Sequence, residues 1–304
     1  METRKIGSLD VSIVGLGCNN FGWRLDYDRT VAVVDAALEA GINFLDTADI
    51  YGGTESEEFL GRALQGRRDR IVLATKFGMK VDEKRQGAKP AYVKQACEDS
   101  LRRLRTDCID LYQLHQPDPE TPIADTLAAL DALVKSGKVR EIGCSNFSVE
   151  QLREAESAAG QGAKFVSVQN EFSLLHRDPE KGVLAECERQ GLAFLPFFPL
   201  AGGMLTGKYH RGEPAPANAR LAKGSPRFLN DRNLEIVEKL RAFADVKRHS
   251  LLDLAFSWLL SHPPVASVIA GATTPEQVKA NVAAGGWRLT ADDLTEIDRL
   301  APGA

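Results

Sequence analysis

The sequence has 304 residues, of which 43% are hydrophobic and 26% charged, and this balance is typical of a globular protein with a large core. A formal net charge of −4 argues against a nucleic-acid-binding surface, which needs a basic face, and gives no reason to expect an anionic membrane as partner. No apolar run approaches the roughly 18 residues that cross a membrane, and residues 1–15 lack the apolar core of a signal peptide. We therefore expect a cytoplasmic protein.

The hydrophobic pattern alternates between strands and helices along almost the whole chain. Residues 3–12 are predicted to form a hairpin that precedes a first strand, Ile13–Gly17. Later strands are predicted at Phe44–Ala48, Ile71–Lys76, Cys108–His115, Val139–Ser145, Phe165–Asn170, Leu192–Pro199 and Ser267–Gly271. Helices are predicted at Asp28–Ala40, Glu55–Gln65, Ala91–Arg105, Ile123–Ser136, Val149–Ala159, Pro179–Gln190, Leu234–Val246 and Leu251–Leu260. A last helix is expected from the N-cap signal at Thr290 to about Leu300.

Successive strands begin about 30 residues apart, which is the length of one βαβ unit. Eight such units predict a single (β/α)8 barrel, the TIM-barrel fold, as one domain over residues 1–304. One connection is far longer than the others. It follows the seventh strand, and its first part, Gly202–Asn230, is rich in Gly, Pro, Arg and Lys. Because a loop of this length inside a compact domain is usually functional, we expect it to clasp a ligand.

Three consecutive strands end in polar residues. In the stretch Asn43–Gly52, apolar Phe44 and Leu45 are followed by a polar cluster that contains Asp46 and Tyr51. The next two strands stop on Lys76 and His115. Each of these residues alone is most often structural. The carboxyl ends of parallel strands meet at one pole, however, and α/β proteins place their chemistry there. We therefore expect the four side chains to form one site.

These four residue types suit the reduction of a carbonyl group. Negative charge develops on the oxygen during that reaction, so an acid must stand beside it. A free tyrosine has a pKa of about 10, and a nearby ammonium lowers it, which Lys76 can do for Tyr51. Asp46 can pair with the lysine, and His115 can orient the oxygen. His115 could also be the acid, because the usual pKa of histidine, about 6.5, suits neutral pH.

The sequence words DTADIYG, ATKFG and LYQLHQPD resemble those of the aldo-keto reductases, and the resemblance extends over nearly the whole chain. It implies an enzyme that reduces an aldehyde, ketone or sugar with a nicotinamide cofactor. It also implies that Tyr51 is the acid, that Lys76 and Asp46 tune it, and that His115 orients the substrate. One branch of the family, the potassium-channel β-subunits, suggests an alternative, a redox-sensing regulatory protein with little turnover.

The resemblance further implies the cofactor site. The nicotinamide carboxamide is expected at Ser145, Asn146 and Gln169, and its ring against Phe197, where the family usually has a tyrosine that stacks. The pyrophosphate is expected along a glycine-containing loop, at Leu200, Gly203, Leu205 and Lys208. The adenosine 2′-phosphate is expected at the start of a helix, near Gly271, Thr273, Gln277 and Asn281. Some relatives carry Lys or Arg at the places of Gly271 and Gln277, and this departure argues against a strict preference for NADP(H). We therefore expect NADP(H) to be preferred modestly, with NAD(H) as a weaker cofactor.

Two further side chains are expected to line the substrate pocket. Trp23 follows the first strand, and Gln116 stands where the family often has a tryptophan, which leaves the pocket more open. The chain contains five histidines but no HExxH motif and no Cys/His cluster, so no metal site is expected. The odd number of cysteines, five, and the absence of a CxxC pair favour reduced, mostly buried thiols.

Overall fold

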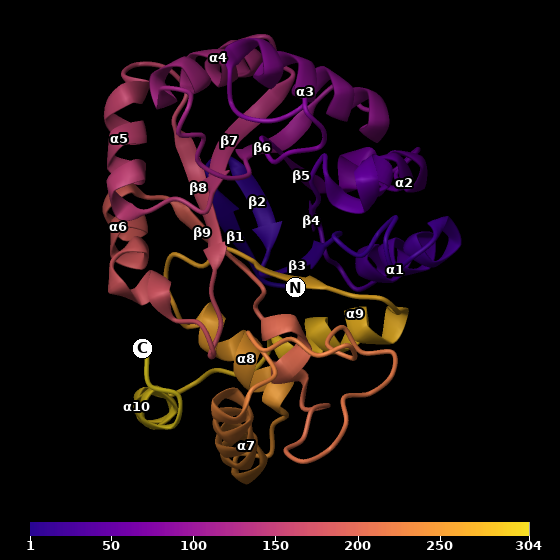
Figure 1. The fold of residues 1–304 in the computed structure, drawn as a ribbon, viewed down its shortest axis with the longest axis vertical. Helices are drawn as coiled ribbons and strands as arrows, with labels where there is room; N and C mark the ends of the chain where they lie inside the picture. The colour runs from indigo at the N-terminus through magenta and orange to yellow at the C-terminus, as the bar shows by residue number, and fades with distance from the viewer. Residues whose placement is uncertain (304) are drawn as a thin grey trace.

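Eight short parallel strands form the inner layer of the fold in the computed structural model, which describes residues 1–303 (Figure 1). Neighbouring strands pair in the order β10-β3-β4-β5-β6-β7-β8-β9. Their bounds are β3 Val14–Gly17, β4 Phe44–Asp46, β5 Val72–Phe77, β6 Ile109–Leu114, β7 Val139–Ser145, β8 Phe165–Glu171, β9 Ala193–Phe197 and β10 Val268–Gly271. The predicted (β/α)8 barrel is confirmed.

The barrel closes between its last two strands without a regular ladder. The Phe194 amide of β9 donates to the carbonyl of Pro264 at 2.7 Å, and the Ala266 amide donates to the carbonyl of Phe194 at 3.1 Å. Both bonds are made by residues that precede β10, near the amino ends of the strands. The segments that follow β9 and β10 therefore separate at the carboxyl pole, and each contributes a wall of the cavity there.

An antiparallel hairpin covers the amino ends of the strands, as predicted. Its strands are β1 (Thr3–Ile6) and β2 (Leu9–Ser12), and Ile6 and Leu9 pack with apolar side chains from the floor of the barrel. Gly7 in the turn has φ +54°. The backbone N–H of the next residue, Ser8, donates to the carboxylate of Glu141 at 2.8 Å. Because this pole is sealed by apolar packing, the opposite pole is the place for a binding site.

Helices surround the barrel, and α7 to α10 gather at the lower end of the view in Figure 1. The bounds are α1 Tyr27–Glu39, α2 Glu55–Ala63, α3 Pro90–Leu104, α4 Ile123–Lys135, α5 Val149–Ala159, α6 Val183–Gln190, α7 Asp231–Val246, α8 Leu251–Leu260, α9 Pro275–Ala284 and α10 Ala291–Leu300. The predicted cap at Thr290 is confirmed, because its hydroxyl accepts from the Asp293 amide and the Asp293 side chain bonds back. No helix in residues 1–303 is long and apolar enough to cross a membrane.

One predicted helix differs from the structure. The segment Pro179–Gln190 is divided by Gly182 into a 3-10 turn, Asp178–Lys181, and the shorter helix α6. Apolar spacing alone does not detect this break, because Leu184 and Cys187 stay in register with the core on the α6 side. Glycine is the residue that leaves helical geometry at the lowest steric cost.

Candidate active site

A buried ion pair lies at the carboxyl pole of the barrel. Lys76 on β5 has no exposed surface, and its Nζ donates to Oδ2 of Asp46 at 2.6 Å and to the carbonyl of Thr47 at 2.9 Å. Burial lowers the pKa of Lys76, but the charges of Asp46 and Tyr51 outweigh that effect, and the net pKa is raised. Lys76 is therefore an ammonium group across the neutral range.

The other oxygen of Asp46 is also fully used. Oδ1 accepts from Nε2 of Gln113 at 3.1 Å and from Nε2 of Gln169 at 3.0 Å. Buried charges persist when such partners satisfy their remaining hydrogen-bonding capacity. Gln169, expected only beside the nicotinamide, thus also supports the ion pair. Gln113 was not predicted, although a glutamine on the apolar strand β6 was a visible signal.

Tyr51 stands directly over this ion pair. Lys76 Nζ lies 5.2 Å from the centre of the Tyr51 ring. Burial raises the pKa of Tyr51, and the attraction of Lys76 offsets this only in part. The lowered pKa of Tyr51 that the sequence predicted is therefore wrong, because the neighbouring ammonium was visible in the sequence and the burial of the ring was not. The phenol keeps its proton at neutral pH, which is the state that a proton donor needs.

A sharp turn holds Tyr51 in place. The two glycines that follow it, Gly52 and Gly53, have φ of +61° and +66°, which a residue with a Cβ atom rarely adopts. A Cβ atom on Gly52 would also collide with the carbonyl oxygen of Phe21 in the loop after β3. The turn that carries Tyr51 is thereby packed against that loop.

His115 meets Tyr51 edge-on at the same pole. The two ring centres are 5.8 Å apart and the planes are inclined by 79°. Burial, assisted by the charge of Lys76, lowers the pKa of His115 to about 3. The imidazole is therefore neutral over the physiological range. Its Nδ1 is buried and has no hydrogen-bond partner among residues 1–303, while the residue itself lines the cavity described below.

Ser145 at the end of β7 and the residue after it, Asn146, are hydrogen-bonded to the backbone of Gln169 and His115. Ser145 Oγ donates to the carbonyl of Gln169 at 2.7 Å, and Asn146 Nδ2 donates to the carbonyl of His115 at 3.0 Å and to Ser145 Oγ at 3.1 Å. Asn146 has φ +62°, a left-handed conformation that asparagine tolerates better than most residues. The structure therefore brings these residues to the rim of the site, as expected.

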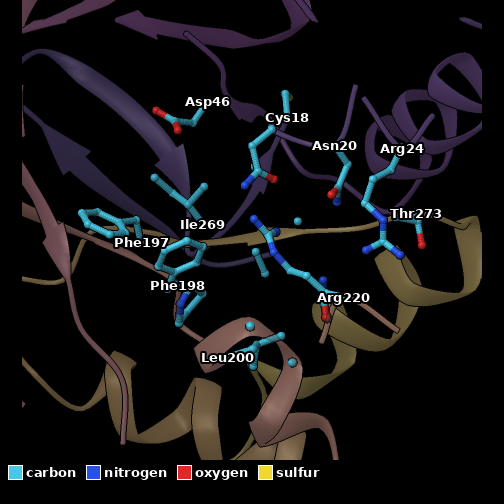
Figure 2. A pocket seen from close by; sticks show the side chains of 18 of the residues that line it. Cys18, Asn20, Arg24, Asp46, Phe197, Phe198, Leu200, Arg220, Ile269 and Thr273 are labelled. Carbon is cyan, nitrogen blue, oxygen red and sulfur yellow. The ribbon is translucent and has the colours of Figure 1, made fainter. Parts of the chain in front are cut away.

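These residues open into one elongated cavity of about 840 Å³, a size within the usual range of ligand sites (Figure 2). Most of the predicted site residues line it: Asp46, Tyr51, His115, Gln116, Ser145, Asn146, Gln169, Phe197, Leu200, Gly203, Lys208, Gly271, Thr273, Gln277 and Asn281. Three predicted residues do not line it. Lys76 lies beneath it, Leu205 is fully buried, and Trp23 is 63% exposed outside it.

The family model of the aldo/keto reductases matches residues 13–302. The chain belongs to the aldo-keto reductase family. Among its relatives, an uncharacterized oxidoreductase YqkF of Bacillus subtilis is 36% identical, with 98% of this chain and 95% of that protein covered. A probable aldo-keto reductase 1 of Glycine max is 34% identical, with 98% and 88% covered.

Two solved structures share the fold of this aldo-keto reductase. The holo form of the aldo-keto reductase AKR11C1 from Bacillus halodurans superposes with a TM-score of 0.84 at 34% identity, covering 100% of this chain and 97% of that one. The glycerol dehydrogenase AKR11B4 from Gluconobacter oxydans gives 0.86 at 33% identity, covering 98% and 94%. Members of the family are oxidoreductases that use nicotinamide cofactors.

The cavity of this aldo-keto reductase has the features that such a cofactor needs. Phe197 and Phe198 supply flat rings to the cavity wall. Lys208 Nζ lies close to the backbone of Gly203, 3.1 Å from the place that a Cβ atom on that glycine would occupy. Three cations, Arg24, Lys208 and Arg220, line the cavity, and burial together with the charge of Arg24 lowers the pKa of both Lys208 and Arg220. A dinucleotide offers aromatic rings that can stack on the phenylalanines and phosphates that can pair with the cations.

Arg24 and Arg220 were not predicted from the sequence. Both lie in irregular loops, Arg24 after β3 and Arg220 in the long connection after β9. The Arg220 guanidinium stands 5.6 Å from the ring centre of Trp23 and 5.3 Å from that of Phe198. The sequence offered only one signal for Arg220, the many Arg and Lys residues of the long loop. That signal indicates that the loop binds an anion, but it does not say which residue makes the contact.

Proposed function

We propose that this aldo-keto reductase reduces the carbonyl group of a small aldehyde, ketone or sugar to an alcohol, in a reversible reaction. The observation that supports this most is the contact between the rings of Tyr51 and neutral His115. Both rings lie next to the buried ion pair of Lys76 and Asp46. A bound nicotinamide cofactor would supply the hydride. The chain's own residues would supply the proton and the orientation of the carbonyl.

Tyr51 is the proton donor in this proposal. Its raised pKa keeps the phenol protonated until negative charge appears on the carbonyl oxygen. Lys76 then stabilises the phenolate that remains, and Asp46 holds the ammonium at the correct place. Neutral His115 can donate one hydrogen bond to the same oxygen, which orients the carbonyl without competing for its proton.

Steady turnover on a generic aldehyde such as 4-nitrobenzaldehyde tests the proposal, with cofactor oxidation followed by absorbance. Cofactor binding with at most one turnover would overturn it in favour of the regulatory alternative. The comparisons give that alternative no support, since the relatives are named as an oxidoreductase, aldo-keto reductases and a glycerol dehydrogenase. A cytoplasmic location, one domain over residues 1–304 and the absence of nucleic-acid and membrane partners stay predictions.

NADP(H) is expected to bind more tightly than NAD(H), by about tenfold. A charged hydrogen bond to a phosphate contributes about 1.5–3 kcal/mol, and about 1.4 kcal/mol is a factor of ten in affinity. The predicted 2′-phosphate site, at Thr273, Gln277 and Asn281, lines the cavity as expected. Titrating each cofactor into the ligand-free protein, with tryptophan fluorescence as the signal, gives the ratio. Equal affinities, or tighter binding of NADH, would contradict the prediction.

The loop Gly202–Asn230 is expected to become resistant to trypsin when cofactor binds. It is folded on itself, because Tyr209 is buried and its hydroxyl accepts from the Leu221 amide at 3.2 Å. It also reaches across the cavity, since Arg24 Nη2 donates to the carbonyl of Asn218 at 2.9 Å. A ligand held under the loop stabilises the closed form by mass action.

The measurement is limited proteolysis with and without NADPH, read by mass spectrometry. Cleavage after Arg248, an exposed residue between α7 and α8, provides the internal control because it lies outside the loop. Slower cleavage within the loop with unchanged cleavage at the control is the expected result. Equal rates within the loop in both states would show that it does not clasp the cofactor.

A further inference from the structure

Helix α9 contributes no cation to the described lining of the cavity, although a 2′-phosphate at this end would require one. The residues of α9 that line the cavity, Gln277, Ala280 and Asn281, are uncharged, and the first turn of the helix also carries the carboxylate of Glu276. Thr274 caps the helix by accepting from the Gln277 amide, and the amide and hydroxyl of Thr273 donate to Oε1 of Gln277. A phosphate monoester carries about 1.5–2 negative charges at pH 7, and neutral donors alone balance this charge poorly.

The loop after β3 brings a cation to this end of the cavity. The amides of Arg24 and Leu25 both donate to the carbonyl of Asn20, at 2.8 and 3.0 Å, which closes a tight turn. Asn20 Nδ2 donates to the carbonyl of Ala272 at 3.3 Å, and this bond fixes the turn to the segment that leads into α9. Arg24 and Thr273 both line the cavity, and Figure 2 shows them on the side away from Asp46 and Phe197.

Asn20 itself indicates that a ligand belongs here. Its side chain is only 4% exposed and lines the cavity, and Oδ1 has no hydrogen-bond partner among residues 1–303. A buried acceptor without a partner is costly, and a bound hydroxyl or amino group that reached Oδ1 after a small movement of the side chain would satisfy it. Adenosine carries both kinds of donor, on its ribose and on its base.

The three cations of the cavity divide between two places. Lys208 lies over Gly203 in the short 3-10 segment Ala201–Thr206 that follows β9. The Arg220 guanidinium lies near the rings of Trp23 and Phe198. Both are therefore placed toward the centre of the cavity, where the pyrophosphate is expected. Arg24 is the cation whose backbone is fixed to the α9 end. Its charge also lies close enough to lower the pKa of Lys208 and Arg220, so an anion beside it would relieve repulsion among the three.

We propose that Arg24, positioned by Asn20, binds the 2′-phosphate of NADP(H) and sets the preference for NADP(H) over NAD(H). The loop after β3 would then supply the charge that relatives place on the helix after the eighth strand. This inference rests on the proposed function, because it requires a nicotinamide cofactor in the cavity. It goes further by naming the residue that discriminates between the two cofactors.

The test compares 2′,5′-ADP with 5′-AMP by isothermal titration calorimetry, since these nucleotides differ only in the 2′-phosphate. Arg24→Gln is expected to weaken 2′,5′-ADP by about 10- to 100-fold while 5′-AMP changes little. Arg24→Lys, which keeps the charge and loses the planar fork, is expected to fall between wild type and Arg24→Gln. Thermal unfolding of each variant shows whether its fold is intact, and Arg24→Lys supplies the comparison if Arg24→Gln is unstable.

Arg220→Gln serves as the matched control. It removes another arginine that lines the same cavity and is expected to weaken both nucleotides by the same factor. Loss of the bond from Arg24 to the Asn218 carbonyl would likewise weaken both nucleotides equally, so the ratio of the two affinities isolates the phosphate contact. An unchanged ratio in Arg24→Gln, or a change of ratio in Arg220→Gln instead, would overturn the inference. Failure of the wild type to bind NADPH and NADH would overturn the proposed function itself.

Discussion

Tyr51→Phe is expected to lower kcat for an aldehyde by at least about 10²–10⁴-fold, the usual contribution of general acid catalysis. The substitution keeps the ring above Lys76 and removes only the hydroxyl proton. Cofactor affinity is expected to change little, because the predicted nicotinamide contacts are made by Ser145, Asn146 and Gln169. Steady-state kinetics with 4-nitrobenzaldehyde and a fluorescence titration of NADPH provide the two measurements.

Tyr112→Phe is the matched control for this experiment. Tyr112 is fully buried and stacks on Phe77, its hydroxyl has no partner among residues 1–303, and it does not line the cavity. Removing that hydroxyl is expected to leave kcat unchanged. A fall in kcat in Tyr51→Phe that also occurred in Tyr112→Phe would indicate a general loss of structure.

The competing assignment makes His115 the acid. Its pKa of about 3 means that the imidazolium, the form that donates a proton readily, is absent between pH 5 and 8. If His115 were the acid, kcat would already be falling steeply as pH rises through that range. We expect no such fall. Retention of near wild-type kcat by Tyr51→Phe, together with its loss in His115→Phe, would assign the role to His115.

The sequence could predict the elements whose signals are local. Strand and helix periodicity, turn glycines and the Thr290 cap located the barrel, and polar residues at strand ends located Asp46, Lys76 and His115. These signals suffice because parallel strands bring their carboxyl ends to one pole whatever the loops do. The hydrogen bond from Gln169 to Asp46 depends on the distance across the barrel, which one chain segment does not encode.

Local sequence signals could not predict which loop residues enter the cavity or how burial changes a pKa. Arg24 and Arg220 enter the cavity from loops without periodicity, and Trp23 lies exposed beside it. The pKa of Tyr51 is a sum of opposing effects, and only the folded structure shows that burial outweighs the ammonium. Sequence motifs thus identify the reacting groups, whereas their protonation states follow from the packing around them.

Lys76→Met is expected to destabilise the fold by about 3–5 kcal/mol, which is typical when one member of a buried ion pair is removed. Asp46 would keep its two glutamine partners but lose the ammonium 2.6 Å away. The pKa of Lys76 is raised in the folded protein, so the pair's contribution is complete below the unfolded value of about 10.4 and lost above the folded pKa. The loss in Lys76→Met should therefore be constant between pH 7 and 9. Urea unfolding at both pH values measures it.

Asp46→Asn combined with Lys76→Met separates the ion pair from the shape of the site. Asp46→Asn alone leaves the ammonium of Lys76 buried without its counter-charge, so each single variant carries an uncompensated charge. In the double variant both charges are gone, and the new amide oxygen can still accept from Gln113 and Gln169. It is therefore expected to unfold at a higher urea concentration than either single variant, although kcat stays low because the ammonium that stabilises the phenolate is absent. Additive losses in the double variant would show that Lys76 and Asp46 act independently, and would remove the reason for treating them as a pair that serves Tyr51.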